Sequence, residues 1–452
     1  MLVIRIPLEY VKVCPTYGPG FFYIPGTTTC LKIGGFVEAV GYVPTATTKG
    51  TDSVNSHAQG RVTFDARDTT EYGLLRTFVR LDYIRSSGSD DNSGSWPRRG
   101  QTIVAGSKGY GNLQTSFGGS EAYIQFGGLT AGRLVTSSFT GLSRVQWTTA
   151  GPGTGRVNEI AYTAALGGGV SVTAAIEDAA EMREGIWGAN SSWTGGKTVA
   201  SGTTPAAGYL GSLNTWPTTG ATVIPNNVPD GVLTVDVAQA WGTAKLSGIY
   251  HNVKPDQLTT GDNSKTGYAV TGAVKINLPM IAAGDNFQAF GSYGEGAVGR
   301  VLGNVMTDTN PSNGSYGFGR NTIGAYDGYV LGGHLKLATA YAVGAQFEHY
   351  FAPTVSTYLA GSWGKVSYGT GNCTSQAACA AADPAAAGNG PNGGTMWTAG
   401  VGVIWSPTTG LEINPEVYYR KSIQKVGNAS EGVVTSASDD QIGVKIRVAR
   451  SF

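Results

Sequence analysis

The chain has 452 residues, of which 13% are charged, and its formal net charge is +1 at pH 7. Charged residues reach only about half of their usual share, and 69 glycines and 22 tyrosines stand among many uncharged polar residues. The small net charge and the lack of a basic stretch argue against general nucleic-acid binding. No apolar run approaches the roughly 18 residues of a transmembrane helix, and no linker divides the chain into domains.

The N-terminal half alternates polar and apolar residues with a period of two, which predicts β-strands with two different faces. Within 61–68, Arg61, Asp65 and Arg67 share one face and Val62 lies on the other. The stretch after the turn at 71–73 repeats this pattern, with Arg76, Arg80 and Asp82 sharing a face.

The C-terminal half has the same alternation with large aromatic residues at its ends. Trp397 and Trp405 share a face and lie roughly 20 Å apart along the axis of a barrel whose strands tilt by about 40°. This spacing nearly matches the ~25 Å apolar band of an outer-membrane barrel, which aromatic girdles flank. A buried soluble sheet with two core tryptophans is the alternative, but similar strand ends at Trp363, Tyr419 and Phe452 favour contact with lipid.

We expect an all-β fold, a transmembrane antiparallel barrel of sixteen strands. Tight turns alternate with long loops at 86–118, 179–230, 296–338 and 367–394, as in single-chain bacterial barrels. The stretch 327–337 also looks like a strand, and we assign it to the preceding loop or to an extension of the next strand. The expected strands are 30–44, 57–70, 72–85, 119–128, 129–136, 157–166, 168–178, 231–240, 241–253, 265–277, 285–295, 339–351, 354–366, 395–406, 410–423 and 438–452.

Several segments resemble a known family, the alpha-proteobacterial outer-membrane porins. The most specific is residues 13–36, VCPTYGPGFFYIPGTTTCLKIGGF, which is similar to the opening of these porins. GRVTFDAR at 60–67, EYG at 71–73 and EAYIQFGGLT at 121–130 resemble the same family. The final strand, Ile442 to Phe452, is similar to the signal that the outer-membrane assembly machinery reads.

This resemblance implies a homotrimer of sixteen-stranded barrels in the bacterial outer membrane, in contact with lipid and lipopolysaccharide. Each barrel would hold a water-filled pore, narrowed by a loop after the fifth strand at about 137–158. Residues 1–29 would form a segment on the periplasmic side, and residues 30–452 the barrel. The family often has a basic residue at position 38, where this chain has Glu38, so charge selectivity does not follow from the resemblance.

Four cysteines are consistent with an oxidising compartment such as the periplasm. They allow three pairings, of which Cys14–Cys30 and Cys373–Cys379 are the local choice, and free thiols are the alternative. Residues 1–7 are too short for the apolar region of a signal peptide, so we expect a leader that was removed, or a misassigned start.

The inner wall of such a barrel would carry its chemistry. A lipid-facing arginine costs ~2–4 kcal/mol at the membrane midplane, so the polar strand faces should point inward. These arginines either form a basic ladder that favours anions, or pair with Asp65, Asp82 and similar neighbours and stiffen the wall. The expected pore-lining residues are Arg61, Arg67, Arg76, Arg80, Arg133, Arg144, Arg156, Glu38, Asp65, Asp82, Glu412 and Glu416.

The expected constriction loop, 137–158, carries Arg144 and Arg156 but no carboxylate. Counter-charges would then come from Glu38, or from Glu412 and Glu416 on the strand before the last. We therefore predict a weakly anion-preferring pore.

No enzyme or cofactor is expected. The sequence offers no nucleophile with a base and an orienting partner, and the cysteine and histidine spacing does not suggest a metal site. A general diffusion porin is the leading interpretation. The alternative, a substrate-specific channel of the same fold, would need an aromatic track, and the lumen-facing aromatic residues do not form an obvious one.

Overall fold

The structure is a computed structural model. Within the part of the chain that it describes, no helix has the length and apolar character needed to cross a membrane. The described residues are 11–44, 54–87, 114–145, 147, 149–152, 155–178, 180, 182–187, 221–222, 228–254, 264–303, 326–331, 334–368, 393–428 and 433–452.

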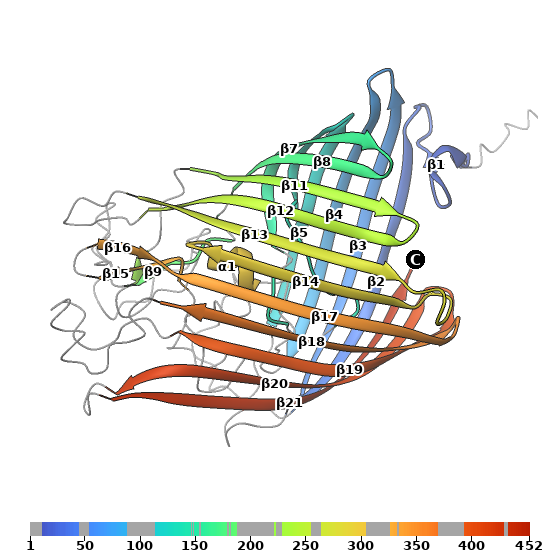
Figure 1. Cartoon of the computed structure of the whole chain (residues 1–452). Coiled ribbons are helices and arrows are strands. Elements are labelled where there is room, and N and C mark those ends of the chain that lie inside the picture. Colours follow the sequence, from blue (N-terminus) through green and yellow to red (C-terminus); the bar gives the residue numbers. More distant parts are fainter. Residues whose placement is uncertain are drawn as a thin grey trace, which may run out of the picture.

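Sixteen antiparallel strands form a closed barrel (Figure 1). The first and the last of them, β2 and β21, pair from Phe36 with Ser451 to Pro44 with Gly443, which closes the sheet. The expected fold is therefore confirmed. The strands are β2 (Cys30–Pro44), β3 (Asn55–Thr70), β4 (Gly73–Ser87), β5 (Gln114–Phe126), β6 (Leu129–Val135), β7 (Arg156–Gly167), β8 (Val170–Glu177), β11 (Asp230–Gln239), β12 (Gly242–Val253), β13 (Lys265–Asn277), β14 (Asn286–Glu295), β17 (Thr339–Ala352), β18 (Val355–Ser367), β19 (Gly394–Thr408), β20 (Leu411–Asn428) and β21 (Val433–Ser451).

The two ends of the barrel differ. One end, the turn end, carries short connections such as 71–72, 168–169 and 409–410, and the C-terminus lies there (Figure 1). The other, the loop end, carries the long connections. β20 and β21 extend further toward the loop end than expected, to Asn428 and from Val433. The alternation of polar and apolar residues is weaker in these extensions, so the sequence did not predict them.

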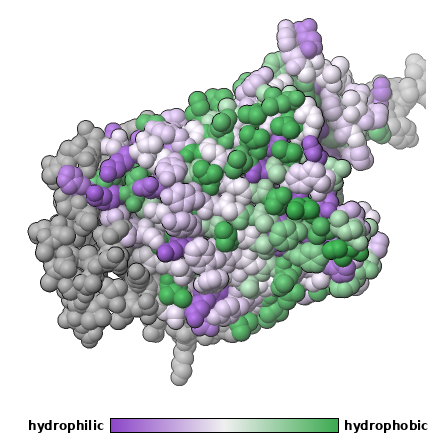
Figure 2. Space-filling model, viewed as in Figure 1, coloured by the Kyte–Doolittle hydropathy of each residue, from purple (hydrophilic) through white to green (hydrophobic). Residues whose placement is uncertain are grey.

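The outer face is apolar because the strand alternation turns every second side chain outward. Val401 is 46% exposed and Trp405 is 48% exposed, whereas Arg80 is 7% exposed. Figure 2 shows apolar residues gathered over the strands nearer the turn end. The expected girdle residues Trp397, Trp405, Tyr419 and Phe452 are all exposed, and Trp363 pairs with Trp397 on the same face.

The N-terminal segment is fixed to the turn end of β2. Cys14 and Cys30 form the expected disulfide, with Cα atoms 6.0 Å apart. Between them lie a short 3₁₀-helix, η1 (Pro15–Tyr17), and β1 (Phe22–Tyr23), which pairs with β2. Cys373 and Cys379 lie outside the described residues.

Two features of the loop end were not expected as such. A separate small sheet contains β9 (Ile186–Trp187), β10 (Ala221–Thr222), β15 (Gly328–Leu331) and β16 (His334–Leu337). The strand-like stretch 327–337 therefore belongs to the long loop after β14, as one of the two assignments had it. The same loop carries helix α1 (Val298–Leu302), all of whose residues are buried.

Candidate functional site: the inner wall and the inward-folded loop

Four arginines of the expected ladder point into the barrel from β3 and β4. The side chains of Arg61, Arg67 and Arg76 are 22%, 25% and 20% exposed. Their outward neighbours on the same strands, such as Val62, are also exposed, so the barrel wall has two accessible faces here. These guanidinium groups are therefore open to solvent from inside the barrel.

Carboxylates pair with this ladder along its whole length. Asp82 accepts hydrogen bonds from Arg61 Nε and Arg80 Nε, both at 2.7 Å. Glu121, on β5, lies 2.7 Å from Arg80 Nη1 and 2.9 Å from Arg156 Nε. The paired arrangement, one of the two alternatives left open by the sequence, is thus realised for these arginines.

Asp65 serves the turn-end half of the ladder. Its carboxylate lies 2.7 Å from Arg67 Nη2 and 2.9 Å from Arg76 Nε. The Arg76 guanidinium also lies 5.1 Å from the ring centre of Phe78 and 5.5 Å from that of Tyr123. Such cation–π contacts attract the guanidinium to the rings and help to hold Arg76 in place.

The connection between β6 and β7, residues 136–155, folds into the barrel, and we call it the pore loop. Its base is closed by a 3.0 Å hydrogen bond from Thr136 N to Gly155 O. From there it reaches inward-facing side chains of distant strands. Thr271 of β13 donates to Ser138 O at 3.2 Å, and Ala150 N donates to Ser362 Oγ of β18 at 2.8 Å.

An aromatic stack holds the far part of the pore loop. The Trp147 ring lies 6.0 Å from that of Tyr358 and 5.7 Å from that of Tyr418, with interplanar angles of 21° and 15°. Tyr418 in turn stacks on Tyr42 at 6.2 Å. Gly400 leaves room for the indole, because a Cβ there would lie 2.9 Å from Trp147 Cη2. The stacking fixes the pore loop against β18, β19 and β20.

A chain of alternating charges joins the pore loop to the wall. Arg144 lies 3.1 Å from Glu348 and 3.8 Å from Glu412. Arg447 of β21 bridges Glu412 and Glu38, both at 2.6 Å. The counter-charges beside Arg144 are therefore Glu348 and Glu412, whereas Glu38 is linked to it through Arg447 and Glu412.

The expected contribution of Glu416 is different. Its side chain accepts a 2.6 Å hydrogen bond from Tyr358 and lies 3.9 Å from Lys445 Nζ, and Glu416 is 2% exposed. It supports the wall behind the aromatic stack.

Arg133 was expected on the inner face, and the strand register contradicts this. Arg133 pairs with Ala122 of β5 and with Asn158 of β7, and both of these residues are exposed on the outer face. Opposed residues of antiparallel strands point to the same side. The inward position next to it is Gly132, which pairs with the inward-facing Tyr123. The short length of β6 left too few residues for its alternation to be read.

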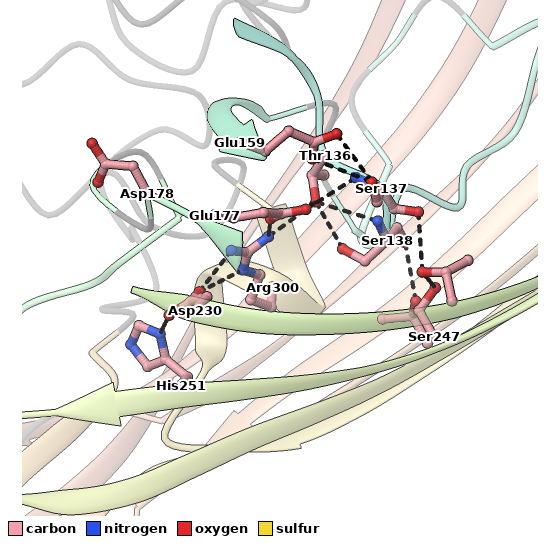
Figure 3. A network of polar contacts seen from close by, with 12 residues as sticks. Thr136, Ser137, Ser138, Glu159, Glu177, Asp178, Asp230, Ser247, His251 and Arg300 are labelled. Atoms are coloured by element: carbon pink, nitrogen blue, oxygen red, sulfur yellow. Dashed lines mark hydrogen bonds and ion pairs between the residues drawn. The ribbon is translucent and has the colours of Figure 1, made fainter. Parts of the chain in front are cut away.

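A buried network sits at the root of the pore loop (Figure 3). Arg300 of α1 lies 2.6 Å from both Glu177 and Asp230. Thr136 also donates to Glu177, at 2.9 Å, and His251 lies 2.7 Å from Asp230. Burial alone would lower the pKa of the Arg300 guanidinium, but Glu177 and Asp230 outweigh it and hold that pKa above its ordinary value.

Sequence reasoning missed several charged residues of this site, among them Glu121, Glu348, Arg447 and Arg300. Glu121 had a usable signal, because Glu121, Tyr123 and Gln125 alternate with Ala122 and its apolar neighbours in the same way as the residues of β3 do. Arg300 had none, since it lies in a long loop without periodicity. The described residues contain no group of three or more histidine, cysteine or acidic side chains arranged to hold a metal.

A family model described as a porin subfamily matches residues 3–444. Porin Omp2a of Brucella ovis is 31% identical over 180 residues, which cover 38% of this chain and 51% of that protein. Porin Omp2b of Brucella canis is 34% identical over 188 residues, covering 40% and 48%. The chain thus spans about half the length of the curated relatives it matches.

One solved structure shows the same fold over nearly the whole chain. The outer membrane channel DcaP of Acinetobacter baumannii superposes with a TM-score of 0.58, covering 95% of this chain and 99% of that one. The two sequences are 16% identical, so this similarity concerns the fold alone.

Proposed function

The chain belongs to the porin subfamily, and on that premise we propose that it forms a water-filled channel in the bacterial outer membrane. Small hydrophilic solutes and ions would cross it by passive diffusion. One observation carries the proposal: the barrel has an apolar outer face, while solvent-accessible charges such as Arg61 and Arg67 line the inside opposite the pore loop. A soluble sheet would bury the outer residues instead.

The charge balance of the inner wall supports a weak preference for anions. In the arginine ladder and the chain of charges from Arg144 to Glu38, seven guanidinium groups meet six carboxylates, a local excess of one positive charge, while other ion pairs of the wall, such as Lys245–Asp236, are balanced. Because almost every charge has a close partner of opposite sign, the field in the pore is weak. The groups are Arg61, Arg67, Arg76, Arg80, Arg144, Arg156 and Arg447, with Glu38, Asp65, Asp82, Glu121, Glu348 and Glu412.

Planar-bilayer recordings test this function. We expect ohmic single-channel currents that do not saturate with salt, and a small reversal potential of the sign for anions in a salt gradient. A reversal potential of the opposite sign would contradict the anion preference, and the lack of any conductance by a folded barrel would contradict the channel.

The proposal extends to assembly. Three copies would associate in the membrane, with lipid and lipopolysaccharide around them, and the assembly machinery would read the last strand up to Phe452. The alternation of exposed Ile442, Val444 and Ile446 and the exposed terminal ring of Phe452 support this reading. An oligomer that persists on an unboiled gel and dissociates on heating is the expected result.

A further inference from the structure

Like the pore loop, the loop after β14 enters the barrel. Helix α1 is buried along its length, and it lies inside the ring of strands in Figure 1. Gly299 touches another inward segment so closely that a Cβ there would lie 2.3 Å from Met182 O. Val298 N donates to Asp327 at 2.6 Å. Two sides of α1 are therefore fixed by neighbouring segments.

A third side of α1 carries Arg300, which is 3% exposed. Its Nε and Nη2 donate to Asp230 of β11 at 3.0 and 2.6 Å. Its Nη1 donates to Glu177 of β8 at 2.6 Å and to Thr136 Oγ1 at 3.1 Å. One side chain thus joins two wall strands to the first residue of the pore loop.

The same carboxylate that binds Arg300 also holds the start of the pore loop. Glu177 accepts hydrogen bonds from Thr136 Oγ1 at 2.9 Å and from Ser137 N at 3.1 Å. Ser137 O then accepts from Lys245 at 3.2 Å. Figure 3 shows the Arg300 guanidinium between Asp230 and Glu177, with the Glu177 carboxylate next to Thr136. Loss of Arg300 would leave the buried Glu177 without its cation, while Asp230 would keep its 2.7 Å contact with His251.

We propose that Arg300 is a positioning residue for the pore loop, so that the loop after β14 sets the direction in which the pore loop enters the barrel. This inference rests on the proposed channel function. Without Arg300, the root of the pore loop would move between several positions, and the current through the open channel would fluctuate, while the barrel itself would remain closed.

Single-channel recording of the full chain tests this inference with two variants. Arg300→Ala removes the guanidinium group that contacts Asp230, Glu177 and Thr136. Thr136→Val keeps every ion pair and removes the hydroxyl that contacts Arg300, Glu177 and Ser138. For each we expect at least a roughly tenfold rise in the ratio of closed to open time, which equals about 1.4 kcal/mol. Arg300→Lys keeps the charge but not the forked geometry of the guanidinium. Its ratio of closed to open time should lie between those of Arg300→Ala and the unmodified chain.

Asp285→Asn is the matched control. It weakens a 2.7 Å contact between a carboxylate and His349 at the turn end. The same carboxylate accepts from Tyr350 N, and Tyr350 touches the pore loop at Arg144 rather than at its root at Thr136. The control should behave like the unmodified chain.

The outcomes separate this inference from the proposed function. Failure of the unmodified chain to conduct overturns the channel. A conducting chain in which folded Arg300→Ala, or Arg300→Lys where only that variant folds, keeps the closed-to-open ratio of the original overturns the role of Arg300. An unchanged ratio in folded Thr136→Val overturns the part of that role that runs through the Thr136 hydroxyl. Equal fluctuation in the Asp285→Asn control also overturns it, because the effect would then be general destabilisation.

Discussion

Two glutamates face each other directly across β7 and β8. Glu159 and Glu177 are paired in register and are 5% and 0% exposed. Like charges in such a position repel, and only Glu177 has Arg300 beside it. The two carboxylates should therefore differ in what they contribute to stability.

Glutamine at each of these positions tests the difference. Glu177→Gln breaks a buried ion pair, and we expect a loss of about 3–5 kcal/mol. Glu159→Gln removes the repulsion and keeps a Ser137 contact, so stability should stay the same or rise. Thermal unfolding followed by circular dichroism in detergent measures both. Equal destabilisation by the two changes would contradict this account of the pair.

Glu412 is the partly open carboxylate beside the pore loop, with a side chain that is 27% exposed. Glu412→Gln removes a negative charge that partly neutralises the positive charges of Arg144 and Arg447. Charges within about 10 Å of a permeating ion act on it at 0.1 M salt. We therefore expect the reversal potential in a salt gradient to shift further toward anion preference.

The control for Glu412 is Asp236→Asn, which removes a carboxylate whose partner is Lys245 on another part of the wall. It should change the reversal potential less than Glu412→Gln does. A shift toward cations with Glu412→Gln would show that this carboxylate does not face the ion path.

At the scale of a strand, β6 is the exception in the barrel. It spans only Leu129–Val135, because the chain then leaves the wall to form the pore loop. Its outward side places Arg133 beside Asn158, on the face that also carries the exposed Ile124 and Ile160. A lipid-facing arginine would be costly, so this position should be covered by a neighbouring copy of the chain.

Arg133→Ala tests whether β6 lies at a contact between copies. If a neighbouring copy covers Arg133, the substitution should lower the temperature at which the oligomer dissociates on unboiled gels. The unfolding temperature of the separated barrel should stay the same. If lipid covers Arg133 instead, removing the charge should raise the stability of the barrel and leave the oligomer unchanged.

For the whole molecule, the strands and their faces could be predicted from the sequence because the barrel obeys one local rule. Every strand has one face toward water and one toward lipid. The alternation from Ile442 to Val448 therefore indicates directly that the apolar side chains face outward, toward lipid. The N-terminal disulfide was also predictable, since its cysteines are close in the chain.

The interior of the loop end could not be predicted in this way. Arg300 meets Glu177, which is 123 residues away, and no local pattern encodes that contact. The residues of α1 are buried among protein on all sides, so their sequence does not show the alternation of polar and apolar residues that marks a strand between water and lipid. For the same reason, the sequence left open whether the arginine ladder was paired, because Arg80 and Glu121 lie 41 residues apart.

The two faces of the barrel lead to a prediction about the whole molecule. Val401 lies between Trp397 and Trp405 on the outer face of β19, at the middle of the apolar band. Val401→Lys should cost about 2–4 kcal/mol and reduce folding into lipid vesicles. Thr63→Lys places the same charge on the inner face of β3, where water is available, and should fold with much smaller loss. The folded fraction on unboiled gels measures both. Equal tolerance of lysine at the two positions would mean that the outer face does not contact hydrocarbon.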